Sequence, residues 1–227
     1  MARLLILVSL LCVATGVFAQ CIQQDEGRAL HARYQVFDGD TSRHVDFYRF
    51  QDRVAWRQGE VISVWRKDAD SASLLRVFPG HQRSIWYPTG DLRALGKEAQ
   101  WQTVTGWPQP EKAGFTPVND SSVVVVQGCK AWQYEKAGQT VLWAEEPALP
   151  VRMSDGERRW QLVSLQQVPA SETFVRWEQW PSTDFADVGD NEADPFLRKM
   201  IALGFVEHGA SGFYSAEGEA RQGGHHH

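Results

Sequence analysis

The sequence predicts a mainly β protein (α+β) built on an antiparallel sheet, and three observations support this fold class. Short runs rich in Val, Ile, Trp, Tyr and Phe recur along most of the chain. Polar turns that contain glycine separate these runs, as at Asp38–Asp40. Apolar and charged residues alternate within many runs, as in His44–Phe47, which is typical of a sheet with one face in water. We expect neighbouring runs to pair as hairpins in a meander.

Residues 1–19 have the layout of a secretory signal peptide. Arg3 precedes an apolar run, Leu4–Val13, and small residues then lead to Ala19. We expect cleavage after Ala19, because the apolar run is shorter than the about 20 residues that cross a bilayer. The mature chain is then exported and carries no transmembrane segment. A retained anchor and a lipid-modified Cys21 are alternatives, and Gln20 argues against the second because lipoprotein signals place a small residue there.

The first half of the mature chain is expected to form mostly strands. A short helix at Gln23–His31 precedes them, and a second short helix is expected at Thr89–Leu95, entered through Pro88. The predicted strands are 30–37, 44–50, 53–57, 60–66, 73–79 and 83–87.

The second half repeats this pattern after an interruption. Residues 101–120 are rich in proline and predict a long irregular connection. The strands expected after it are 122–127, 130–135, 140–145, 149–153, 159–168 and 173–178. We expect one β-rich domain over residues 20–214 and a disordered tail over residues 215–227, since the tail is small, polar and rich in glycine.

A C-terminal helix is expected at residues 195–203. Asp194 suits the N-cap, Pro195 suits the first helical position, and Gly204 suits the position after the last turn. Acidic residues just upstream are favoured by the positive end of the helix dipole.

Two segments are candidate metal sites. Asp184, Asp187 and Asp190 recur at intervals of three around a glycine, and loops of this composition supply oxygen ligands to calcium. Capping and local hydrogen bonding are the favoured alternative, because the spacing does not match an EF-hand. His225–His227 can hold copper or zinc through imidazole nitrogens, or can be a native tail without function or the remnant of a tag.

Several functional classes are disfavoured by composition and motifs. The whole chain has a formal net charge of −5 and no clustered Lys/Arg stripe, so nucleic acid is not an expected partner. No nucleophile elbow, phosphate-binding glycine loop, HExxH or CxxCH motif occurs. We therefore expect a protein that is not an enzyme. The isolated histidines are expected to be ordinary surface or hydrogen-bonded residues: His31, His44, His81 and His208.

Two cysteines remain once the signal peptide is removed, Cys21 and Cys129. A single pair in an oxidising compartment is expected to form a disulfide bond. Closing a loop of this size contributes about 4–5 kcal/mol in the chain-entropy model. Two free thiols are the alternative.

The ten tryptophans fall mostly inside or beside predicted strands. Such residues usually fill the core of a protein. The functional alternative is that a curved sheet with many large rings lines a concave apolar groove for a ligand.

Three segments carry a family resemblance. Arg53–Trp56 is similar to an arginine–aromatic strand R-x-x-W, Ile85–Pro88 to a strand end l-w-x-Y-x-P, and Leu149–Met153 to a segment l-P-x-r-i. Together they resemble the LolA/LolB/RseB-like fold of the Gram-negative envelope, over about residues 25–180. The resemblance implies a strongly curved antiparallel sheet, or incomplete β-barrel, with a few short helices covering its open side and an apolar cavity between. Members carry lipoproteins, hold acyl chains or sense envelope components, and are not enzymes.

The resemblance implies a periplasmic binding or carrier protein for an acyl or lipid-like ligand. Trp56, Trp86 and Tyr87 lie on the matching strands and are the candidate cavity wall. One alternative is an accessory or structural subunit that docks on an envelope protein complex through residues 101–120 and the C-terminal helix. Another is a metal-binding periplasmic protein that takes calcium, copper or zinc.

Overall fold

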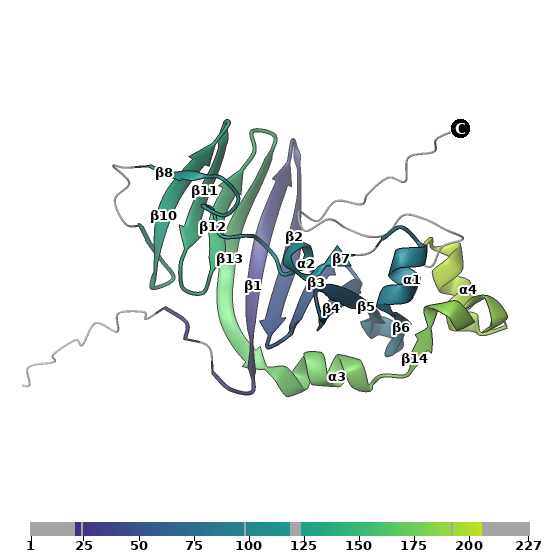
Figure 1. Cartoon of the computed structure of the whole chain (residues 1–227). Coiled ribbons are helices and arrows are strands. Elements are labelled where there is room, and N and C mark those ends of the chain that lie inside the picture. The colour runs from purple at the N-terminus through teal and green to yellow at the C-terminus, as the bar shows by residue number, and fades with distance from the viewer. Residues whose placement is uncertain (1–20, 24, 98, 119–123, 192, 206–227) are drawn as a thin grey trace, which may run out of the picture.

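One large, strongly curved and mainly antiparallel sheet forms the body of the protein (Figure 1), and it is not closed into a barrel. The computed structural model describes residues 21–23, 25–97, 99–118, 124–191 and 193–205. The predicted fold class is confirmed. The expected signal peptide, C-terminal tail and terminal histidines lie outside the described residues.

The first six strands form a continuous meander, each antiparallel to the next. All six were expected, because each is a short run rich in β-branched and aromatic residues that polar turns separate from the next. Glycines with positive φ close two of the tight turns, Gly39 and Gly59. The strands are β1 (Arg28–Asp38), β2 (Thr41–Phe50), β3 (Arg53–Gln58), β4 (Val61–Asp68), β5 (Ser71–Phe78) and β6 (Arg83–Tyr87).

A second meander joins the first through its last strand. β13 pairs with β1 from Arg28↔Pro169 to Asp38↔Arg158, so the first strand of one meander and the last strand of the other lie side by side within one sheet. The strands of this half are β9 (Val124–Val126), β10 (Cys129–Lys136), β11 (Gln139–Ala144), β12 (Leu149–Ser154) and β13 (Arg158–Pro169). Three further strands are short. β8 (Thr116–Pro117) pairs with β10 and β14 (Ser182–Asp184) is parallel to β6, at the two ends of the sheet, whereas β7 (Ala99–Gln100) pairs with the start of β5.

The helices are short. α1 (Thr89–Ala94) confirms one predicted helix, and α2 (Trp101–Val104) interrupts the proline-rich connection. α4 (Pro195–Ala202) begins as expected, because the Asp194 carboxylate accepts a hydrogen bond from the Phe196 N–H at 2.8 Å. The remaining helical turns are α3 (Phe174–Gln179) and the 3₁₀ turns η1 (Pro79–His81), η2 (Ala170–Glu172), η3 (Phe185–Asp187) and η4 (Gly189–Asn191). None of the helices in the described residues has the length and the apolar composition of a membrane-spanning helix.

Two sequence predictions are wrong. The run 173–178 forms α3 instead of a strand, because Phe174 and Trp177, one helical turn apart, both bury their rings on the same face of the sheet. The expected helix at Gln23–His31 gives way to the start of β1 at Arg28. There β1 gains a hydrogen-bonded strand on each side, β2 and β13, which a short helix at this position would lose.

The curvature of the sheet defines a concave and a convex face. Trp56 on β3 and Trp160 on β13 are separated by two strands, which places their backbones at least about 14 Å apart on a flat sheet. Their ring centroids are nevertheless 6.5 Å apart. Side chains on this face therefore converge, and the face is concave. The main core lies here and includes residues of α1, α2 and α4, whereas α3 covers the convex face.

The predicted disulfide bond is confirmed. Cys21 and Cys129 are bonded across a sequence separation of 108 residues. The bond ties the segment before β1 to the start of β10, and this tie shapes the pocket described next.

Candidate functional site

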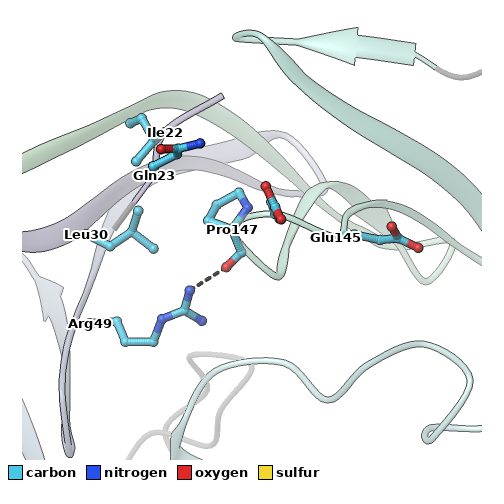
Figure 2. Close-up of a pocket in the computed structure, with 7 residues that line it drawn as sticks. Ile22, Gln23, Leu30, Arg49, Glu145 and Pro147 are labelled. Atoms are coloured by element: carbon cyan, nitrogen blue, oxygen red, sulfur yellow. Dashed lines mark hydrogen bonds between the residues drawn. The ribbon is translucent and has the colours of Figure 1, made fainter. Parts of the chain in front are cut away.

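A pocket of about 410 Å³ lies at one end of the concave face (Figure 2). It is bounded by the segment that follows Cys21, by the paired ends of β1 and β2, and by the turn between β11 and β12. Its lining residues are Ile22, Gln23, Leu30, Arg49, Glu145, Glu146 and Pro147. Together they present three apolar residues, one amide, one cation and two carboxylates.

The strand register explains why Leu30 and Arg49 meet in this pocket. Leu30 on β1 lies directly opposite Arg49 on β2. Successive side chains of a strand alternate between faces, so Arg49 shares the concave face with Phe47, which belongs to the main core. An arginine therefore occupies an inward position that an apolar residue would normally take.

Arg49 is a partly buried cation with a single described hydrogen bond, donated to the carbonyl of Pro147 (Figure 2). Burial lowers the pKa of Arg49, and the neighbouring Tyr34 offsets part of that effect. A guanidinium nevertheless stays charged at physiological pH. Among the described residues no carboxylate forms an ion pair with Arg49.

Glu145 and Glu146 do not neutralise this charge. Both side chains are exposed, and Figure 2 shows the Glu145 carboxylate on the far side of Pro147 from the Arg49 guanidinium. Water screens their effect on the pocket interior. The interior is thus positive and the rim is negative.

Tyr34 links the pocket to the aromatic core. Its side chain is fully buried, its hydroxyl donates to the carbonyl of Pro150 at 3.0 Å, and burial raises its pKa well above the usual value. Its ring belongs to a group that we call the aromatic cluster, which consists of Tyr34, Phe47, Trp56, Trp107 and Trp160.

Trp107 is the member of the aromatic cluster that does not come from the sheet. It lies in residues 105–118, which we call the crossing segment because they lead from α2 across the concave face to β8 (Figure 1). Its ring centroid lies 5.0 Å from that of Tyr34, 5.1 Å from Trp56, 5.6 Å from Phe47 and 5.8 Å from Trp160.

The three residues predicted to line a cavity do not gather in one place. Trp56 is buried within the aromatic cluster. Tyr87 is buried elsewhere in the main core, with its ring stacked on Phe185 at 4.7 Å. Trp86 precedes it in β6, points to the opposite face and is 40% exposed.

The predicted metal ligands are dispersed along the surface. Asp184 ends β14, Asp187 lies in η3 and Asp190 lies in η4, and all three side chains are exposed. Over the part of the chain that the structure describes, no group of three His, Cys, Asp or Glu residues is placed to hold a metal ion.

Sequence reasoning missed Arg49. The signal that marks it is a charged residue at an inward position of an alternating strand, two residues after the buried Phe47. The pocket itself could not be predicted from the sequence, because the disulfide bond positions Ile22 and the turn between β11 and β12 positions Pro147.

Fold and pocket together define a curved-sheet protein with a ligand-sized pocket at one end of its concave face. No protein-family model and no curated protein matches the chain. Among solved structures, the chain is similar to one described as "Structure of PNGF-II in C2 space group", with a TM-score of 0.39 and 10% sequence identity. That match covers 69% of this chain and 31% of the other. A likeness of this degree assigns neither a fold family nor a function.

Proposed function

We propose that the protein is an exported, non-enzymatic binding or carrier protein, and that its pocket accepts an apolar ligand with one anionic end, such as a fatty-acid carboxylate. One observation carries the proposal. Arg49 brings a partly buried cation, which no carboxylate of the described residues pairs with, to a pocket whose apolar walls are Leu30, Ile22 and Pro147.

The energetics favour an occupant of this kind. Taking a cation out of water costs free energy that one carbonyl hydrogen bond compensates only in part. A carboxylate would supply two parallel charge-assisted hydrogen bonds to the planar guanidinium. The volume also lies within the about 300–1,000 Å³ that is usual for small-molecule pockets.

The rim narrows the class of ligand. Glu145 and Glu146 are exposed lining residues, and the repulsion that remains after screening by water is larger for a multiply charged anion than for a single carboxylate. This favours a monoanion with an apolar chain over a phosphate compound.

The cellular setting is part of the proposal. The Cys21–Cys129 bond supports export, because disulfide bonds persist in oxidising compartments. The periplasm is the compartment that the LolA-like resemblance suggests, and an acyl or lipid-like ligand agrees with that resemblance.

The test is direct binding to delipidated protein. Decanoate titrated by calorimetry should bind the wild type, and Arg49→Gln should weaken binding by about tenfold or more, the loss expected for a charge-assisted pair. Arg57→Gln is the matched control, because Arg57 is exposed on β3. No binding of decanoate or of a hydrophobic dye to the wild type would exclude the carrier function.

Native mass spectrometry of protein purified from its own source supplies an independent readout. A co-purified apolar acid would support the proposal. A stoichiometric protein partner without lipid would favour the accessory-subunit alternative instead.

A further inference from the structure

The concave face continues beyond the pocket, and Trp107 occupies that continuation. Leu30 and Arg49 form one cross-strand row, and Ala32 and Phe47 form the next row on the same face. Two residues of strand advance about 7 Å. Ala32 is small and completely buried, and the indole of Trp107 packs against Phe47 in this row. The ring therefore lies against the row next to the Leu30–Arg49 row that borders the pocket.

The crossing segment and Val104, the last residue of α2 before it, are held through backbone carbonyl groups. The indole N–H of Trp56 donates to the carbonyl of Val104 at 3.4 Å, and the Lys136 ammonium donates to the carbonyl of Ala113 at 2.6 Å. Near its far end, β8 pairs with β10 over two residues. The segment is thus positioned on both sides of Trp107 by bonds that do not involve the indole.

The indole itself makes only packing contacts. Its buried N–H has no hydrogen-bond partner among the described residues, whereas buried tryptophans usually have one. Gly106, directly before it, has φ of +111°, and a Cβ there would lie 3.4 Å from the Phe47 ring. The backbone therefore passes close over the sheet, which lowers the indole into the space between four other rings.

We propose that Trp107 sets the length of the apolar chain that the pocket accepts. This inference rests on the proposed binding function. With the carboxylate at Arg49, the chain of a ligand runs along the concave face and ends against the indole. Without the indole, Phe47, Trp56 and Trp160 would line an extension of the pocket. Dry apolar cavities of about 150 Å³ are known to accept small apolar molecules.

The experiment compares chain-length profiles. Straight-chain carboxylates from hexanoate to hexadecanoate are titrated into wild type, Trp107→Ala, Trp107→Leu and the control Trp101→Ala, which alters a partly buried tryptophan of α2. In wild type and Trp101→Ala, affinity should stop rising at one chain length. In Trp107→Ala it should continue to rise, by about fourfold for each further methylene buried.

The outcomes separate the two proposals. If wild type binds and folded Trp107→Ala shows the same limiting length, Trp107 does not set the length and the inference is overturned, while the binding function stands. If Trp107→Ala fails to fold, as circular dichroism would reveal, Trp107→Leu decides by the same criterion. If no carboxylate binds the wild type, the proposed function falls and this inference falls with it.

Discussion

The Nε2 atom of His31 lies 2.8 Å from the Oδ1 atom of Asp46, buried on the convex face between β1 and β2. The other ring nitrogen of His31 lies 2.9 Å from the amide of Gln166 on β13, and Arg33 donates to Asp46 at 2.7 Å. The Tyr48 ring stacks on the imidazole with 4.3 Å between centroids. Both imidazole nitrogens are thus occupied, and the group joins the three central strands.

Because Asp46 is paired with His31 and Arg33, the free energy of unfolding should decrease at low pH. Burial alone raises the pKa of this carboxyl group, but hydrogen bonds from His31 and Arg33 and their charges outweigh that effect and lower the pKa to about 2. In the unfolded chain the pKa is near 3.9. The ionised Asp46 carboxylate therefore contributes about 2 kcal/mol to the free energy of unfolding. This contribution is complete above pH about 4 and is lost as the pH falls through about 2.

Urea unfolding between pH 2 and 6 measures this dependence. Asp46→Asn should flatten the acid limb, whereas Asp40→Asn, in an exposed turn, should leave it unchanged. An identical acid limb in Asp46→Asn and wild type would contradict the assignment.

Loss of the Cys21–Cys129 bond should lower both stability and ligand affinity. The bond closes a loop of 108 residues, and removal of a native disulfide typically costs about 2–5 kcal/mol. Ile22 and Gln23 would also lose the anchor that holds them at the pocket. The Cys21→Ser/Cys129→Ser variant should unfold at lower urea and bind decanoate more weakly than wild type. Added reductant should then have no effect on the variant. Equal stability of the two proteins would refute this prediction.

The helical state of residues 174–179 predicts a specific mutational pattern. Phe174 is fully buried, and truncation to alanine should cost about 3–5 kcal/mol of unfolding free energy. Trp177→Ala should also be costly, because a helix places both residues on one face. Val175→Ala should change stability by no more than about 0.5 kcal/mol, since its side chain is exposed. A strand would instead place Val175 and Trp177 on one face, opposite Phe174. Similar costs for Val175→Ala and Trp177→Ala would therefore contradict the helix.

Helix capping and calcium binding, the two roles predicted for the acidic residues between 184 and 194, make stability depend on different side chains. Asp194 caps α4 and accepts a hydrogen bond from Arg83 at 3.0 Å, so Asp194→Ala should lower the thermal midpoint. Asp194→Asn retains a capping oxygen and should lose less. Asp187→Ala should be neutral, because its side chain is exposed. Calcium-dependent stabilisation that Asp187→Ala abolishes would show instead that the acidic loop binds calcium.

Much of the sheet was predictable because strand signals are local. The run His44–Phe47 alternates apolar and polar residues, and β2 places Val45 and Phe47 on the face opposite Asp46. The Asp194–Pro195 pair likewise marks the start of α4, because capping involves only neighbouring residues. Signals of this kind do not depend on the rest of the fold.

The candidate site was not predictable in the same way. Trp56, Trp86 and Tyr87 lie on strands that resemble those of a known family. Trp86 and Tyr87 are neighbours in one strand and therefore point to opposite faces of the sheet, and Trp56 is buried in the core. Arg49 borders the pocket only because the turn that contains Pro147, far from it in the sequence, lies against it in the fold. Sequence composition does not say which inward positions border a pocket.

By itself, the sequence determined the β class, most strand positions, the cysteine pair and the capped C-terminal helix, since each follows from the period of side chains or from contacts between near neighbours. Only the tertiary structure decided that Phe174 and Trp177 face the sheet from a helix, that β1 pairs with β13, and that Trp107 packs against Phe47 on the concave face. These outcomes depend on surfaces that meet only after the sheet has curved, and the free energy of burying such surfaces has no signature in any short segment of the chain.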